Sequence, residues 1–165
     1  MKLVKVSDLF DVVYGSNLEL NALEPDPDGV NFVSRTAQNN GVSAKVKMVS
    51  GEEPIEAGVL TVAGGGSVAE TFLQPEPFYS GRDLFYLRPK VPMSVEQKLF
   101  VCMCIRANKF RFNYGRQANK TLPALLIPDI TEVPDWTKGA FKGVLAKWTA
   151  RLSSLAPVVE ESVHG

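Results

Sequence analysis

The chain has 165 residues, with 18 basic side chains, 18 acidic side chains, a single histidine and a formal net charge of zero at pH 7. This length suits one domain with a hydrophobic core, and 45% hydrophobic against 22% charged residues exclude a disordered chain. No apolar run reaches the roughly 18 residues of a membrane span, and the N-terminus lacks the apolar core of a signal peptide, so we expect a cytoplasmic protein.

The first predicted elements are short. Ser7 can cap a helical turn, and Gly15 can end the segment that follows. Residues 17–29 are polar and contain two prolines, which predicts an exposed loop. Residues 31–33 then provide an apolar strand, after which residues 34–40 carry small or hydrogen-bonding side chains. We therefore expect a strand that ends in a polar loop.

The side chains of this polar loop suit the edges of DNA bases. Arg35 presents a planar fork of donors, whereas Gln38, Asn39 and Asn40 each present a donor and an acceptor on one amide. Arginine pairs in two-pronged fashion with guanine, and asparagine or glutamine pairs in this way with adenine. The Asn-Asn-Gly run equally favours a simple turn, because Asn and Gly tolerate positive φ. Residue types alone do not separate the two interpretations.

Four further strands are predicted before the next helix, over residues 43–49, 57–63, 70–73 and 84–87. The second of these ends in Gly64-Gly65-Gly66-Ser67, where missing side chains allow a backbone or a phosphate to approach closely. No Gly-Lys-Ser/Thr sequence follows, and the dinucleotide fingerprint is incomplete. We therefore favour a bent strand connection over a nucleotide site.

A helix is predicted over residues 94–108, where Ser94 and Gln97 have the spacing of a capping box. Cys102 and Cys104 lie two positions apart on this helix, so their side chains diverge and two buried free thiols are expected rather than a disulfide or a zinc site. Four apolar residues at helical spacing predict the face that packs into the core. They are Leu99, Phe100, Met103 and Ala107.

Residues 109–122 interleave basic, aromatic and amide side chains, a mixture typical of nucleic-acid surfaces. A solvated helix end with Phe110 and Phe112 buried is the competing interpretation. Residues 122–128 predict a short buried strand bounded by prolines. Asp135 can cap a final helix that has an apolar stripe on one face. The stripe consists of Phe141, Val144, Leu145, Trp148, Leu152 and Leu155.

Five short motifs follow one another between residues 4 and 128. They are Asp8-Leu9-Phe10-Asp11 with Tyr14-Gly15, Phe32-Val33-Ser34-Arg35-Thr36-Ala37 with Asn39-Asn40-Gly41-Val42, Thr61-Val62-Ala63 with Gly64-Gly65-Gly66-Ser67-Val68, Phe78-Tyr79, and Phe112-Asn113-Tyr114-Gly115-Arg116 before Leu126-Ile127-Pro128. In this order they resemble one target-recognition domain of the specificity subunits of type I restriction-modification systems, in a single-domain form.

The resemblance implies an α+β fold, with a mixed, largely antiparallel twisted sheet and a few helices, that reads base pairs in the major groove and holds a methyltransferase subunit. Specificity subunits of this family usually carry two recognition domains separated by long paired helices, whereas the terminal helix here is shorter and lacks a sustained heptad. We expect a recognition domain over residues 1–130, a helical docking or dimerisation segment over residues 131–156 and a flexible tail over residues 157–165.

The predicted function is sequence-specific recognition of double-stranded DNA as the specificity component of a restriction-modification system, without catalysis, metal or cofactor. Expected partners besides DNA are a methyltransferase subunit, a restriction subunit and a second copy bound through the C-terminal helix. The zero net charge and the apolar terminal stripe leave an alternative open, a module that docks on a restriction or methylation enzyme without touching DNA. The residues expected to contact DNA are Ser34, Arg35, Thr36, Gln38, Asn39, Asn40, Ser67, Ser80, Arg82, Lys109, Arg111, Arg116, Gln117, Asn119 and Lys120.

Overall fold

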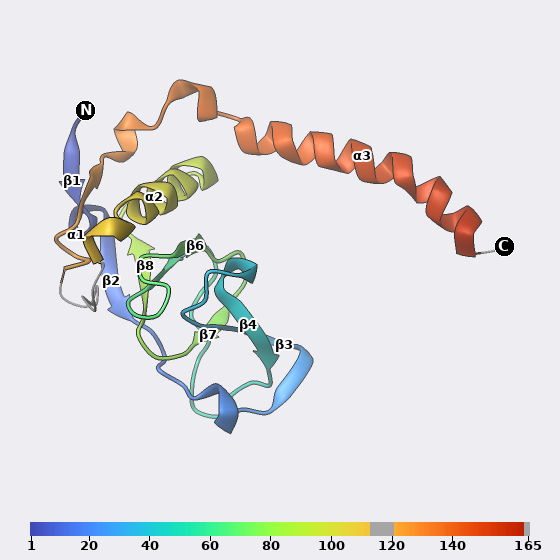
Figure 1. The fold of residues 1–165 in the computed structure, drawn as a ribbon, viewed down its shortest axis with the longest axis horizontal. Helices are drawn as coiled ribbons and strands as arrows, with labels where there is room; N and C mark the ends of the chain where they lie inside the picture. Colours follow the sequence, from blue (N-terminus) through green and yellow to red (C-terminus); the bar gives the residue numbers. More distant parts are fainter. Residues whose placement is uncertain (113–120, 164–165) are drawn as a thin grey trace. The chain divides into compact units, whose positions relative to one another are not determined.

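A four-stranded antiparallel sheet forms the middle layer of Met1–Glu132, the larger of two units in this computed structural model (Figure 1). The second unit is Val133–Gly165, and the structure describes residues 1–112 and 121–163 of the chain. The strands of the sheet, in spatial order, are β2 (Phe10–Tyr14), β8 (Leu84–Pro89), β5 (Leu60–Ala63) and β6 (Thr71–Leu73).

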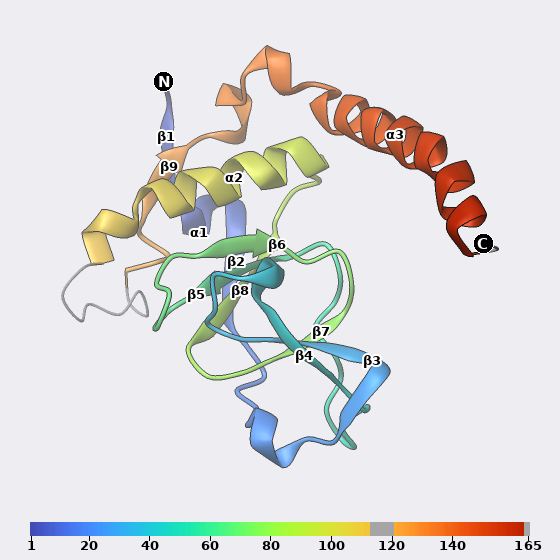
Figure 2. The same cartoon turned by 45° about the vertical axis from the view of Figure 1, so that its right-hand side comes forward.

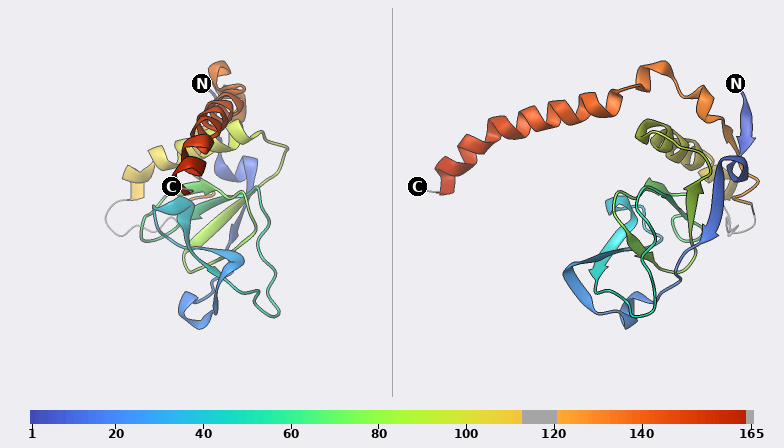
Figure 3. Two further views of the ribbon diagram at one scale, coloured as in Figure 1. Left: turned by 90° about the vertical axis from the view of Figure 1, so that its right-hand side faces the viewer. Right: turned by 180° about the vertical axis from the view of Figure 1, so that it is seen from behind.

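Side chains of this sheet alternate between two hydrophobic cores. In β5, Leu60 and Val62 pack in a core shared with helix α2 (Val95–Ala107), whereas Ala63 packs on the opposite face. Figures 2 and 3 show α2 on one side of the sheet and strands β3 and β4 on the other. Because both faces are covered, all four residues of β5 are buried, which explains its apolar and β-branched composition.

The layer opposite α2 is a three-stranded sheet in the order β4-β3-β7. β3 (Pro25–Val33) pairs antiparallel with β4 (Val42–Val46) and parallel with β7 (Phe78–Ser80). A two-stranded sheet of β1 (Leu3–Lys5) and β9 (Leu126–Pro128) closes the α2 side, next to the short helix α1 (Val6–Leu9). These sheets and helices confirm the predicted α+β class, although the strands are divided among three small sheets.

Helix α2 begins as predicted but packs on another face. The Ser94 hydroxyl accepts a bond from the Gln97 N–H (3.2 Å), and the Gln97 side chain accepts one from the Ser94 N–H (2.8 Å), so the capping box is confirmed. The predicted core stripe is wrong, because Met103 is 63% exposed and Leu99 and Ala107 are also exposed. The buried residues of α2 are Val101, Cys102 and Ile105.

Two strand predictions also differ from the structure. β3 already begins at Pro25, inside the predicted loop, and the pairing with β4 shifts register between Pro25 and Val30, so the intervening residues bulge away. β7 lies between two predicted strands, over residues for which no strand was predicted. Its three residues are buried and pair with β3 across a long sequence separation, which a local pattern does not reveal.

The unit Val133–Gly165 consists of a short 3-10 turn, Asp135–Thr137, and helix α3 (Ala140–Val163). Asp135 does not cap α3 as predicted, because Gly139 has a positive φ of 74° and separates it from the helix. Helix α3 continues past Pro157, where the sequence predicts a tail. A proline removes one intrahelical N–H bond without necessarily ending a helix. No helix within the described residues is both long and apolar enough to cross a membrane.

Candidate nucleic-acid interface

The polar loop after β3, residues 34–41, is closed by local hydrogen bonds. The Ser34 N–H donates to the Gly41 carbonyl (2.9 Å), and the Gln38 N–H donates to the Thr36 hydroxyl (3.2 Å). Asn39, Asn40 and Gly41 have φ values of 45°, 54° and 82°, a left-handed conformation that Asn and Gly adopt readily. We call residues 34–41 the Arg35 loop.

The amides of Asn39 and Asn40 are used inside the protein. Asn39 Nδ2 donates to the Val42 carbonyl (3.0 Å), and Asn40 Nδ2 donates to the Leu73 carbonyl (2.9 Å). The buried Gln74 in turn donates from Nε2 to the Asn40 carbonyl (3.0 Å). These contacts correspond to the turn interpretation of the Asn-Asn-Gly run, and they fix the loop on β6. Both side chains nevertheless remain exposed, as does that of Gln38.

Arg35 forms an ion pair with Asp83, with Nη1 and Oδ2 2.6 Å apart. Two backbone bonds hold Asp83: its N–H donates to the Tyr14 hydroxyl (2.8 Å), and its carbonyl accepts from the Gly64 N–H (2.7 Å). A Cβ atom on Gly65 would lie only 3.1 Å from Arg35 Nη1 and 3.3 Å from Asp83 Oδ2. The Arg35–Asp83 ion pair therefore packs against Gly65, where any larger side chain would crowd the pair.

The end of α2 supplies a second group of cations beside the glycine run. Lys109 Nζ lies 2.5 Å from Glu70 Oε1, and Arg106 Nη1 lies 3.9 Å from Glu70 Oε2. The guanidinium of Arg106 also sits over the Phe72 ring, 5.4 Å from its centroid. Figure 2 shows the C-terminal end of α2 next to the turn between β5 and β6, which carries Glu70.

Backbone bonds connect these two groups. The Ser67 N–H donates to the Arg35 carbonyl (3.3 Å), and the Glu70 N–H donates to the Ser67 carbonyl (3.0 Å). These bonds link Arg35 through the glycine run to Glu70, which pairs with Arg106 and Lys109. We call these linked residues the Arg35–Lys109 strip. Arg111 follows Lys109 in the 3-10 turn Lys109–Phe112, so cations outnumber the two carboxylates of this region, Asp83 and Glu70. A chain of zero net charge therefore carries a locally basic strip.

Several other predicted contacts lie off this strip. Ser80 is excluded from the surface, because its side chain is fully buried and its hydroxyl accepts from the Ser16 N–H (2.7 Å). Arg82 is directed to Glu19, with which it forms an ion pair.

The competing interpretation of residues 109–122, in which Phe110 is buried, is wrong, because Phe110 is 67% exposed beneath the Arg111 guanidinium. The remaining predicted DNA contacts lie outside the described residues. They are Arg116, Gln117, Asn119 and Lys120.

Sequence reasoning missed the two carboxylates that hold the cations, Asp83 and Glu70. The available signal for Asp83 was its position next to Arg82 in a turn-like segment, and for Glu70 its place four residues after Gly66. Neither signal names a partner, since the partners come from other loops. Arg106 was also absent from the residues expected to contact DNA. Across residues 1–112 and 121–163, no group of three or more His, Cys, Asp and Glu side chains is placed to hold a metal ion.

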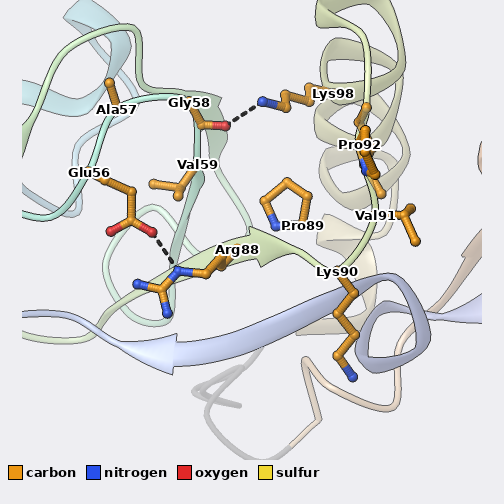
Figure 4. Close-up of a pocket in the computed structure, with 11 residues that line it drawn as sticks. Glu56, Ala57, Gly58, Val59, Arg88, Pro89, Lys90, Val91, Pro92 and Lys98 are labelled. Atoms are coloured by element: carbon orange, nitrogen blue, oxygen red, sulfur yellow. Dashed lines mark hydrogen bonds and ion pairs between the residues drawn. The ribbon is translucent and has the colours of Figure 1, made fainter.

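An open cleft of about 500 Å³ lies at the other end of β8, between residues 56–59 and 88–93 (Figure 4). Lys98 Nζ donates to the Gly58 carbonyl (2.8 Å), and Arg88 Nε donates to Glu56 Oε1 (2.5 Å), an interaction that lowers the pKa of Glu56. The cleft contains none of the predicted DNA contacts. Because of this lack of predicted contacts, the cleft offers a weaker case for a DNA site than the strip.

Comparison with known proteins finds a sequence relative and several solved structures with a similar fold. No protein-family model matches the chain. The specificity subunit S.BcgI of a type II restriction enzyme from Heyndrickxia coagulans is 30% identical over 139 residues, which are 79% of this chain and 39% of that protein. The chain is homologous to part of a restriction-enzyme specificity subunit. The resemblance found in the sequence is thereby confirmed, although this relative is assigned to a type II enzyme.

Solved structures of specificity subunits share the fold. The HsdS subunit from Thermoanaerobacter tengcongensis superimposes with a TM-score of 0.64 at 14% identity, covering 93% of this chain and 39% of that subunit. The type I S subunit from M. genitalium gives 0.60 at 16% identity, covering 95% and 43%. The chain therefore spans about two fifths of the length of S.BcgI and of each of these solved subunits.

Proposed function

We propose that this chain recognises a specific double-stranded DNA sequence as the specificity component of a restriction-modification system, directing a methyltransferase or endonuclease to its site. The observation that carries this proposal is the Arg35–Lys109 strip, in which hydrogen bonds and ion pairs link a base-reading type of loop to a cluster of exposed cations. Homology to a specificity subunit supports it independently.

The strip has separate groups for the two parts of DNA recognition. Arg106, Lys109 and Arg111 are exposed cations at the end of a helix, suited to phosphates, which set the register of a protein on a duplex. Arg35 and Gln38 project from a loop that is fixed at both ends, so their donors are suited to base edges. Glu70 holds two of the cations in place before DNA binds. The chain has no catalytic role in this proposal.

Helix α3 is the proposed attachment to the rest of the system. Its apolar residues alternate at spacings of four and three, the heptad pattern of a coiled coil, over about two heptads. All of them are exposed within the described structure, so a helical partner can bury them. We propose a methyltransferase subunit or a second specificity helix, such as that of another copy, as this partner. The residues are Phe141, Leu145, Trp148, Leu152 and Leu155.

The DNA proposal is tested by selection from duplexes with randomised central positions at physiological salt, followed by sequencing of the retained fraction. Enrichment of one short sequence is expected. Equal retention of all sequences contradicts the proposal, and co-purification with a methyltransferase without salt-dependent DNA binding would instead favour the docking module.

The helix proposal is tested by sedimentation of the wild type and of the double variant Leu145→Asp/Leu152→Asp, with and without a methyltransferase subunit. Loss of association in the variant is expected, since a coiled-coil seam excludes charge. Ser153→Asp on the same helix is the matched control, because Ser153 lies outside the heptad positions. Equal association of both variants contradicts the proposal.

A further inference from the structure

The Arg35–Asp83 ion pair lies in a tightly bonded turn, although the pair itself stabilises the fold little. The two side chains are 44% and 25% exposed, so solvent screens the pair and its contribution to folding is small. Asp83 nevertheless adopts a left-handed φ of 52°, and both of its backbone groups are bonded, one to Tyr14 and one to Gly64. The backbone of Asp83 is therefore fixed at the point where its carboxylate meets Arg35.

Only part of the Arg35 guanidinium is used by this pair. Nη1 faces Asp83 Oδ2, while Nε and Nη2 make no hydrogen bond to any described residue. The glycine run places no side chain beside the guanidinium, and Gly66, with a φ of 60°, lies against the Arg35 backbone. A guanidinium anchored through one nitrogen keeps donors free in a defined direction. This arrangement suits a base edge better than a phosphate, which needs no fixed orientation.

We propose that Asp83 is a positioning residue for sequence readout: it holds Arg35 so that its free donors address a guanine edge rather than the nearest phosphate. This inference rests on the proposed DNA-binding function. The Asp83 carboxylate then has two opposite effects on DNA binding. It weakens binding to any duplex by repelling phosphates, and it sharpens discrimination by orienting the arginine that reads a base. Removing the carboxylate therefore strengthens non-specific binding and weakens discrimination.

Asp83→Asn is the decisive variant. Asparagine tolerates a left-handed φ and keeps the backbone bonds to Tyr14 and Gly64, so only the charge and its pull on Arg35 are lost. Binding is measured by fluorescence anisotropy on the duplex selected by the wild type, on its single-base variants and on an unrelated duplex, each from 50 to 200 mM NaCl. Asp11→Asn is the matched control, because it removes one carboxylate that pairs with Lys90 at the far end of the sheet.

For Asp83→Asn we expect tighter binding to the unrelated duplex, with a salt slope steeper by up to about 0.9 as Arg35 turns to a phosphate. At one base pair, discrimination should fall by about 5- to 150-fold, the range of one two-pronged base contact. Asp11→Asn should change neither discrimination nor the slope by a comparable amount. A purely structural role predicts another pattern, in which both affinities fall together with the melting temperature; that result overturns the inference.

Gly65→Ala provides a second test without a change of charge. The added methyl would lie 3.1 Å from Arg35 Nη1 and forces the guanidinium to shift. Discrimination at the same base pair should fall with an unchanged salt slope, whereas Gly143→Ala, whose methyl meets nothing within 4 Å, should have no effect. If the wild type prefers a sequence and both Asp83→Asn and Gly65→Ala retain that preference, the role of Asp83 is refuted while the proposed DNA-binding function stands. If the wild type prefers no sequence, the proposed function fails and the inference falls with it.

Discussion

Removal of the two cations that Glu70 holds should flatten the salt dependence of DNA binding. The variant is Arg106→Ala/Lys109→Ala, and the structure brings both cations to one carboxylate at the edge of the strip. If each cation neutralises one phosphate, the slope of log K against log salt becomes shallower by up to about 1.8. When salt rises from 50 to 200 mM, the variant should therefore lose affinity by a factor about 12-fold smaller than the factor by which the wild type loses it.

The assay is anisotropy of a labelled duplex over that salt range, with the melting temperature measured in parallel. Arg88→Ala/Lys90→Ala is the matched control, since it removes two ion-paired cations from the opposite end of β8. The control should keep the wild-type slope. An unchanged slope in Arg106→Ala/Lys109→Ala, or an equal flattening in the control, would refute the assignment of phosphate contacts to the end of α2.

Three further predictions concern the support of the strip, the core and an ion pair beside strands β1 and β9. Gln74→Ala removes the buried amide that bonds the Asn40 carbonyl, so unfolding free energy should fall by about 1–3 kcal/mol in denaturant titration. Burial raises the pKa of Cys102 to about 12, so only about one thiol in ten thousand is ionised at pH 8, and mass spectrometry should show its alkylation by iodoacetamide only on unfolding. The hydrogen bond from Lys2 lowers the pKa of Asp129 in the folded protein. The ionised Asp129 therefore stabilises the fold above about pH 4, and this stabilisation is lost as the pH falls through the lowered pKa of the folded state. Asp129→Asn should therefore be less stable than the wild type at pH 7, with the difference narrowing below pH 4.

Each of these three has a clear contrary result. A Gln74→Ala chain as stable as the wild type would mean that water replaces the lost amide. Alkylation of Cys102 in the folded protein as fast as that of a free thiol would contradict its burial. A gap between Asp129→Asn and the wild type that widens in acid would have the wrong sign for a depressed carboxyl pKa.

Local signals in the sequence predicted local structure well. The capping box at Ser94 marked the start of α2 correctly, because both of its bonds lie within four residues. The same helix misled the burial prediction, since it carries apolar residues around its circumference and only packing selects the face with Val101 and Ile105. β7 escaped prediction because its pairing with β3 joins Asn31 to Phe78, far apart in sequence.

The candidate site shows the same division. Arg35 was identified from its residue type and its place in a loop after a strand, both of which are local. Asp83 was not identified, because its role depends on three loops meeting: the Arg35 loop, the glycine run and its own turn. The glycine run was correctly read as a place of close approach, but the group that approaches at Gly65 is an ion pair of the same chain rather than a phosphate.

The central claim is that DNA lies on the Arg35–Lys109 strip and not elsewhere on the domain. Site-specific photo-crosslinking tests it, with the crosslinker placed either at the exposed Ala37 in the Arg35 loop or at the exposed Val91 beyond the opposite end of β8. We expect crosslinks to the selected duplex from position 37 and none above background from position 91. Equal crosslinking from both positions, or crosslinking from position 91 alone, would contradict the account.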